Sequence, residues 1–485
     1  VSCVSIWPTV RLGEVTESMK NGIYKPASAY AEDGYACLRM YNIGDGKLVW
    51  RDIKRMHLSK NELLEYRLLP GDLLVNRVNS RELVGKAAVI PEGIEPLVFE
   101  SKNIRLRLVA NKANPKFINY QLLLNGRRHF STNAQQVVGM ASINQKQLAD
   151  FSVVLPSLPI QQEAVAEIEK QCSRLDEAVA NLKRVKANLK RYKAAVLKAA
   201  VEGKFTADWR REHPEVEPAS QLLERILAER RAKWKGKGAY KEPIATDPSN
   251  LSPLPEGWTW ASVDQCAEVF LGKMLDKEKH RTGRQLPYLR NINVRWGRVD
   301  TDDLLEMFFK NDELERYGLL SGDVLVCEGG EPGRAAVWDG RIPELKYQKA
   351  LHRVRFYGKS EPRYLVFLLE FLANAGRLER WFTGSTIKHF TRESFISLPI
   401  QMPPLKEQEQ IVAEVERRLS VIDELEATVE ANLTRADRLR QSVLSQAFSG
   451  RLLTQDLKSI PSAVATFSIA AESPASYGTD SRAGR

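Results

Sequence analysis

One stretch occurs twice in this chain, and it constrains the fold more than any other feature. The first copy runs from Leu155 to Phe205 and opens LPSLPIQQEAVAEIE, and the second runs from Met402 to Leu452 and opens MPPLKEQEQIVAEVE. An offset of 247 superposes the two copies without a gap. Neither copy has Gly or Pro between its opening prolines and its closing glycine, a pattern typical of one uninterrupted helix. We therefore predict two helices of about 40 residues, each roughly 60 Å long.

Apolar residues in each copy recur at alternating spacings of three and four, the heptad pattern of a coiled-coil seam. The first seam comprises Val165, Ile168, Cys172, Leu175, Val179, Leu182, Leu189, Tyr192 and Val196. The second comprises Val412, Val415, Leu419, Ile422, Val429, Leu433, Leu439 and Val443. Glu426 replaces Val179 of the first copy, and we expect the neighbouring Leu425 to pack there instead. Each seam is too long and narrow for a small domain to cover. We predict that the two helices pair antiparallel, the alternative being two helices that dimerise with other chains.

The segments outside the helices also repeat. LLPGDLLV at Leu68 matches LLSGDVLV at Leu319, and GKAAVI at Gly85 matches GRAAVW at Gly333. Short β-like runs alternate with turns and amphipathic helices in both regions, which indicates an α+β fold with a pseudo-twofold internal repeat. The expected boundaries are a first mixed α/β domain at 1–154, a long helix at 155–205, a connector with a short amphipathic helix at 206–254, a second mixed domain at 255–401, a second long helix at 402–456 and a disordered tail at 457–485.

Charge and cysteine content limit the class of protein. The 485-residue chain carries a net charge of +11, which favours a polyanionic partner. Its five cysteines are far apart and form no CxxC pair, as expected for a reduced, cytoplasmic protein. No apolar run approaches the roughly 20 residues of a membrane span, so no membrane partner is expected.

The repeated framework carries different loops in its two copies, and these loops hold the candidate DNA contacts. Arg, Asn and Gln can read base edges, while Lys, Ser and Thr commonly hold phosphates. The first domain offers Arg77, Asn79, Ser80, Arg81, Lys86, Asn133, Gln135, Gln136, Asn144 and Lys146. The second offers Arg295, Trp296, Arg298, Arg334, Ser385, Thr386, Lys388 and His389. Arg39, Asn42, Arg290 and Asn293 belong to the shared framework, so they could stabilise the fold, grip a backbone or discriminate bases.

Motifs for catalysis are absent from the sequence. It contains no P-loop, no HExxH and no zinc-ligand spacing, so we expect no metal site and no catalytic residue. An alternative is a magnesium-dependent nuclease site at Glu92, Glu100 and Lys102. The second domain has Tyr347-Gln348-Lys349 at the matching place, which excludes a matched pair of such sites.

The helix openings, their AAVEGKF and QAFSGRL endings, the two LxxGD segments and GSTIKHF at Gly384 resemble the specificity subunit of type I restriction–modification systems. The resemblance covers residues 7–456. In the first domain, GMASINQ stands where the family has the GST-x-K-H run.

The resemblance implies a non-catalytic subunit that binds double-stranded DNA. Its two target recognition domains would each read one half of a split sequence, and the helix pair would set the gap between them. Two methyltransferase subunits would carry S-adenosylmethionine, restriction subunits would cleave, and this chain would hold no cofactor. The alternative left open by the residues is a coiled-coil scaffold that binds proteins and never DNA.

Overall fold

The chain divides into two compact units in its computed structural model, which describes residues 7–44, 46–137, 139–232, 234, 238–274 and 282–454. One unit comprises residues 1–181 and 432–485, and the other residues 182–431. Each unit contains one mixed α/β domain, the first domain or the second domain, with part of both long helices. The tail expected to be disordered at 457–485 lies outside the described residues.

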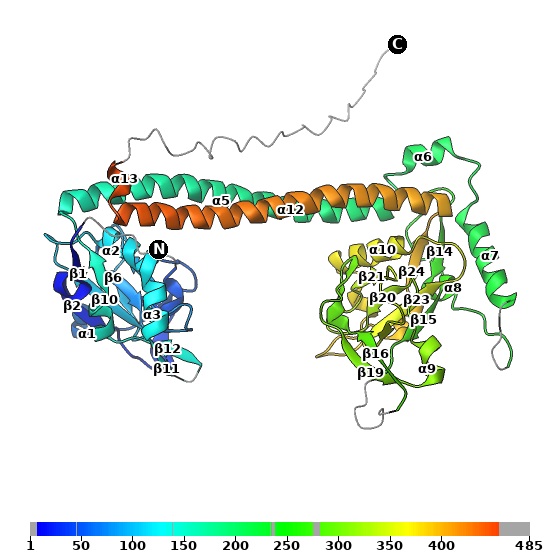
Figure 1. The fold of residues 1–485 in the computed structure, drawn as a ribbon, viewed down its shortest axis with the longest axis horizontal. Coiled ribbons are helices and arrows are strands. Elements are labelled where there is room, and N and C mark those ends of the chain that lie inside the picture. Colours follow the sequence, from blue (N-terminus) through cyan, green and yellow to red (C-terminus); the bar gives the residue numbers. More distant parts are fainter. Residues whose placement is uncertain are drawn as a thin grey trace, which may run out of the picture. The chain divides into compact units, whose positions relative to one another are not determined.

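Two long helices correspond to the repeated stretch. Helix α5 spans Leu158–Val201 and helix α12 spans Leu405–Phe448, 44 residues each (Figure 1). Their first and last residues differ by the same offset of 247, so the sequence repeat is also a structural repeat. Gly203 and Gly450 follow the two helices with φ of +65° and +79°, the left-handed conformation that ends a helix at low steric cost.

Ion pairs show that α5 and α12 run antiparallel. Asp176 pairs with Arg440 in one unit, and Lys186 pairs with Glu430 at 2.6 Å in the other. Moving ten residues forward along α5 moves the partner ten residues back along α12, which is the relation that antiparallel packing requires.

The buried seam follows much of the predicted stripe but drifts away from it. Val165, Ile168, Leu189, Val412, Val415, Ile422 and Val429 are buried, while Leu175, Leu182 and Leu419 are half-buried. Leu425 and Leu439 are 42% and 38% exposed, so their placement in the seam was wrong. Tyr192 is 47% exposed, but its hydroxyl accepts a hydrogen bond from Arg418 of α12, so its side chain lies at the edge of the helix pair.

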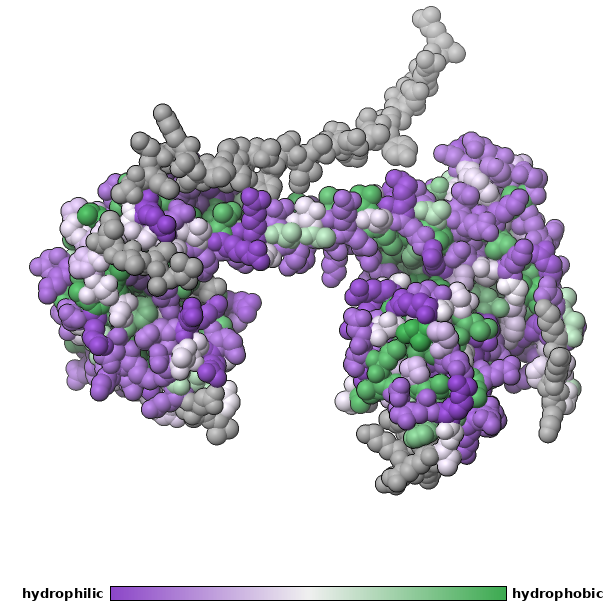
Figure 2. Space-filling model, in the orientation of Figure 1, coloured by the Kyte–Doolittle hydropathy of each residue, from purple (hydrophilic) through white to green (hydrophobic). Residues whose placement is uncertain are grey.

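Glu426 is half-buried, whereas Leu425 is not in the seam at all. A straight helix has 3.6 residues per turn and drifts about 20° per heptad from a strict 3.5 repeat, which changes the buried positions along a helix this long. Figure 2 accordingly shows hydrophobic patches among mostly hydrophilic residues on the helix pair.

Among the described residues, the first domain has four sheets and four short α-helices. A four-stranded sheet has the order β2 (Thr16–Asn21), β10 (Asn103–Leu108), β6 (Leu73–Asn76), β8 (Ala87–Val89). A second has the order β3 (Tyr30–Ala31), β5 (Lys54–Met56), β4 (Tyr35–Leu38), β9 (Leu97–Phe99). The smaller sheets are β11 (Gln135–Val137), β12 (Met140–Ser142), β7 (Val78–Asn79), and β1 (Thr9–Arg11) with β13 (Ser152–Val154). The helices are α1 (Lys60–Tyr66), α2 (Pro115–Gln121), α3 (Arg127–Asn133) and α4 (Gln145–Ala149).

The second domain repeats the order of the first of these four-stranded sheets, while most of its other sheets differ in strand number or pairing. Its four-stranded sheet runs β15 (Ala267–Leu271), β23 (Leu351–Phe356), β20 (Val324–Cys327), β21 (Ala335–Val337). The other sheets are β19 (Leu305–Phe309), β16 (Arg284–Leu289), β22 (Lys346–Tyr347); β17 (Val294–Arg295) with β18 (Arg298–Val299); and β14 (Thr259–Ser262) with β24 (Pro399–Met402). The helices are α8 (Val263–Cys266), α9 (Asn311–Arg316), α10 (Pro362–Asn374) and α11 (Arg392–Ile396).

Framework residues at matching positions make matching internal bonds. Asn42 and Asn293 each accept the backbone N–H of the arginine three residues earlier and donate to carbonyls of the following loop. Arg39 and Arg290 each donate to the backbone carbonyl of an aspartate, at 2.9 and 3.0 Å. These four residues therefore stabilise the fold, one of the roles that the sequence had left open.

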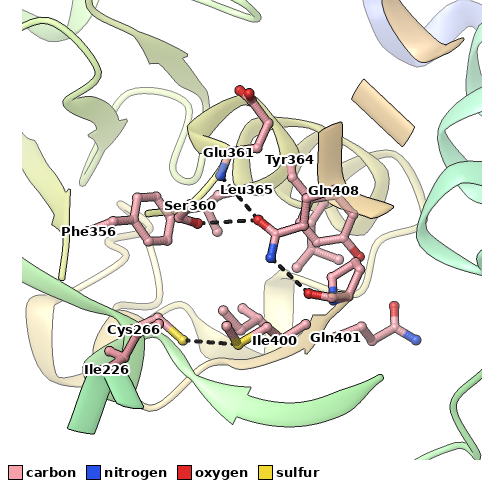
Figure 3. A pocket seen from close by; sticks show the side chains of 13 residues that line it. Ile226, Cys266, Phe356, Ser360, Glu361, Tyr364, Leu365, Ile400, Gln401 and Gln408 are labelled. Carbon is pink, nitrogen blue, oxygen red and sulfur yellow. Dashed lines mark hydrogen bonds between the residues drawn. The ribbon is translucent and has the colours of Figure 1, made fainter. Parts of the chain in front are cut away.

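A buried glutamine joins each mixed α/β domain to the start of one long helix. In the second domain Gln408 donates to the Pro403 carbonyl at 2.9 Å and accepts from the Glu361 backbone N–H at 3.1 Å (Figure 3). Gln161, 247 residues earlier, donates to the Pro156 carbonyl and accepts from the Asn114 N–H. Because Glu361 and Asn114 cap the helices α10 and α2, each glutamine ties a domain helix to the first turn of α12 or α5.

The connector packs on the second domain. Helix α6 spans Ala207–Glu212 and helix α7 spans Ala219–Ala232, and α7 buries Leu222, Leu223 and Ile226. Among the described residues, no helix has the length and apolar character that crossing a membrane requires. Within those same residues, no three His, Cys, Asp or Glu side chains cluster as metal ligands would.

Candidate nucleic-acid interface

Three segments of the first domain meet around the loop after β6. Strand β7 pairs with β12, whose hairpin partner is β11. Arg81 donates from Nε to the Ser131 carbonyl at 3.0 Å, which ties the loop to α3. The Ile143 N–H donates to the Arg77 carbonyl at 2.9 Å, which brings the residues before α4 to the same place. The structure thus gathers segments that are far apart in the sequence.

The predicted side chains of this domain differ in exposure. Arg81, Gln135, Asn144 and Lys146 are exposed, and Arg77, Asn79 and Lys86 are half-buried. The backbone of Gln136 belongs to β11, but its side chain lies outside the described residues.

Asn144 and Asn79 are also held by internal bonds of their side chains. Asn144 caps α4 by accepting the Gln147 N–H at 2.9 Å. Asn79 donates to the Asn76 side chain at 2.7 Å and accepts from the Ser80 N–H at 2.8 Å. These two amides could contact DNA only through the donor and acceptor positions that their internal hydrogen bonds leave unused.

The second domain also brings three loops together, with Glu331 between two of them. Trp296, at the turn of the β17–β18 hairpin, donates from Nε1 to Glu331 at 3.0 Å. Arg334 donates to Glu331 at 2.6 Å and to the Asn291 carbonyl at 2.9 Å. Because the Arg334 side chain is only 13% exposed and is held by these bonds, it positions the loop and leaves little of its guanidinium accessible to DNA.

The β17–β18 hairpin presents two cations. Arg295 and Arg298 face each other across the hairpin and are both exposed. Gly297 forms the turn with φ of +73° and open space around its Cα, so the approach to the hairpin tip is not obstructed by its neighbours.

The third loop of this domain spans residues 383–389. Two backbone hydrogen bonds between Thr383 and His389, of 2.8 and 2.9 Å, close it. The predicted contacts Ser385, Thr386, Lys388 and His389 are all exposed on it. A Cβ built on Gly329 would lie 3.5 Å from the His389 ring, so this loop touches the loop after β20.

A buried histidine anchors the end of that loop. His352 on β23 is fully buried and its Nε2 lies 2.7 Å from the carbonyl of Phe390, the residue after the loop. A carbonyl only accepts, so Nε2 carries the proton. Burial lowers the pKa of His352 below its ordinary value, which keeps the ring neutral at pH 7.

Sequence reasoning missed two exposed arginines beside the first surface. Arg127 and Arg128 open α3, the helix whose Ser131 carbonyl binds Arg81. The RRH run was visible in the sequence, but only the fold places it beside the loop after β6.

Comparisons with known proteins identify a family for this chain. The profile of a family described as the type I restriction modification DNA specificity domain matches residues 5–191 and 255–435. The specificity subunit of the type I restriction enzyme EcoKI from Escherichia coli K12 is 26% identical over 463 residues, which covers 93% of this chain and 90% of that protein. The StySPI specificity subunit from Salmonella potsdam is 28% identical over 232 residues, which covers 46% of this chain and 50% of that protein.

A solved structure is also similar in fold. A chain from a study of complex assembly and conformational transition of the type I R-M system matches with a TM-score of 0.60 and 18% identity, over 92% of this chain and 98% of that one.

Proposed function

Because this chain belongs to the type I restriction–modification DNA specificity family, we propose that it reads a bipartite DNA target, one half with each recognition domain. The first domain uses the surface around the loop after β6, and the second uses the three loops that meet near Glu331. Membership of this family disfavours the alternative function, a coiled-coil scaffold that binds proteins and never DNA.

The observation that carries this proposal is one framework with two sets of loops. Both domains share the four-stranded sheet order and a paired arginine and aspartate, Arg107 with Asp72 and Arg355 with Asp323. Yet the first domain presents a β11–β12 hairpin where the second presents the closed loop 383–389. Equal frameworks with unequal loops suit two readers of different base sequences.

The chemistry would come from partners. Two methyltransferase subunits would bind S-adenosylmethionine and modify the target, and restriction subunits would cleave DNA. This chain would remain non-catalytic. The nuclease alternative is weakened because Glu100 accepts the Met40 backbone N–H at 2.9 Å, which gives that carboxylate a structural role.

The α5–α12 pair would act as the spacer between readers. Each domain is tied to the first turn of one long helix by Gln161 or Gln408. A helix of 44 residues rises about 66 Å at roughly 1.5 Å per residue, so helix length would translate into DNA spacing.

Methylation sequencing of cells that carry this chain with its methyltransferase partners tests the proposal. We expect a methylated motif of two specified halves separated by unspecified bases. Exchanging residues 1–154 for another reader should change one half only. A single continuous motif, or a change in both halves, would contradict the proposal.

A gel shift of the full chain with genomic fragments separates DNA reading from the scaffold alternative. Binding should weaken steeply with salt because phosphate contacts release counterions. Absence of binding at low salt would favour the scaffold.

A further inference from the structure

Three side-chain amides form a chain from the interior of the first domain to its candidate DNA surface. Asn103 donates from Nδ2 to the Leu38 carbonyl at 3.3 Å, and Asn76 donates from Nδ2 to Oδ1 of Asn103 at 3.0 Å. Asn79 then donates from Nδ2 to Oδ1 of Asn76 at 2.7 Å. Asn76 and Asn103 are fully buried, and Asn79 is half-buried at the start of the loop.

The direction of this amide relay is fixed from its inner end. The Leu38 carbonyl can only accept, so Asn103 must turn its NH₂ group inward and its oxygen toward Asn76. The same logic turns the Asn76 oxygen toward Asn79. The outermost amide therefore points its oxygen at the Ser80 N–H, at 2.8 Å, in the free protein.

The loop that follows is closed by its own bonds. The Val84 N–H donates to the Ser80 carbonyl at 3.0 Å, and the Gly85 N–H donates to the Asn76 carbonyl at 2.8 Å. Gly85 has φ of +85°, and a Cβ there would lie 2.3 Å from the Phe130 ring. The relay and these bonds together restrain the loop.

The second domain does without the relay. Asn76 faces Asn103 across β6 and β10, and the matching pair across β20 and β23 is Cys327 and Leu351, both fully buried. The framework therefore folds with an apolar pair at this place. Buried amides are a poorer choice for stability than apolar groups unless every bond is made, so their presence in the first domain calls for another reason.

We propose that Asn76 and Asn103 are positioning residues for DNA reading by the first domain. The relay orients Asn79 and orders the loop at 80–85 before DNA binds. The entropy cost of ordering this loop is therefore incurred during folding and not during binding. Residues that never touch DNA thus set the accuracy of one half-site. This inference rests on the proposed function and deepens it.

The double variant N76C/N103L tests the relay, because it copies the pair of the second domain and removes both buried amides together. Full-length protein would be assayed against DNA libraries randomised in one half-site at a time. We expect discrimination at the first half-site to fall about tenfold, the size of one good base contact, with the second half-site unchanged. I104V, a conservative change at the buried position next to Asn103 on β10, is the matched control and should leave both half-sites intact. Unchanged discrimination by a folded double variant would overturn the proposal.

Hydrogen exchange on the unmodified protein decides the matter if the double variant fails to fold. The amides of Ser80, Val84 and Gly85 should be protected without DNA and gain little on binding. Rapid exchange that slows only with DNA would overturn the relay's role. Failure of the proposed function looks different, since the unmodified chain would then show no preference at either half-site.

Discussion

Two Leu→Ala changes in the same helix test which face of α12 is buried. Leu444 is fully buried in a cluster with Ile168 and Cys172 of α5, although the heptad pattern did not select it. Leu439 was selected by that pattern but is 38% exposed. The two positions lie in one unit and in one helix, so helix propensity cancels in the comparison.

The structure sets the expected magnitudes. Truncating a fully buried leucine to alanine lowers the free energy of unfolding by about 2–5 kcal/mol, and the higher values arise where a cavity remains. We expect about 3 kcal/mol for Leu444→Ala and about 1 kcal/mol or less for Leu439→Ala, whose side chain keeps much of its hydration. At about 2–4 °C per kcal/mol for a unit of this size, the melting temperatures should fall by about 6–12 °C and by less than about 4 °C.

Calorimetry of the full chain with each substitution measures the difference directly. The reasoning predicts that the Leu444 variant melts clearly below the Leu439 variant. Equal losses, or a larger loss at Leu439, would show that the strict heptad phase is right and that the described packing of α12 is wrong.

Three further predictions concern the second domain. Lys388→Ala should weaken DNA binding and lower the salt slope by about 1 if the lysine holds a phosphate, whereas a loss of about 1–3 kcal/mol confined to the cognate base would identify a base reader. Arg334→Ala should lower the free energy of unfolding by about 1–2 kcal/mol in urea, since the guanidinium holds Glu331, and an unchanged midpoint would refute this. His352 is buried neutral with a pKa below the ordinary 6.5, so the unfolded chain takes up its proton first as pH falls. Stability should therefore be full above about pH 6.5 and decline below it, and His352→Gln should reduce that decline in thermal melts between pH 7.5 and 5.

Sequence reasoning predicted the long helices well because their signals are local. Prolines, closing glycines and an unbroken 44-residue run determine where a helix can begin and end, and the offset of 247 appears unchanged in α5 and α12. The phase of the seam was less accurate. A side chain such as Leu439 leaves the interface through small angular drift that accumulates along the helix, which spacing alone does not report.

The candidate site depended on contacts that spacing cannot reveal. Loop composition marks Arg334 as a candidate DNA contact, whereas the structure shows its guanidinium bonded to Glu331 and to the Asn291 carbonyl. Asn76 and Asn103 are 27 residues apart in the sequence, and no sequence pattern predicts that they meet. Their pairing depends on the register between β6 and β10. Loop composition indicated candidate surfaces but did not separate residues that would contact a ligand from residues that position them.

The central claim, that helix length sets the spacing of the half-sites, is tested most directly by lengthening both helices at one level. Four residues would be inserted between Asn181 and Leu182 of α5 and between Thr434 and Arg435 of α12, midway between the two interhelical ion pairs. The added rise is about 6 Å, nearly two base-pair steps of roughly 3.4 Å. Methylation sequencing should then find both half-sites unchanged and the unread gap longer by one or two base pairs. An unchanged gap with normal methylation would contradict the account.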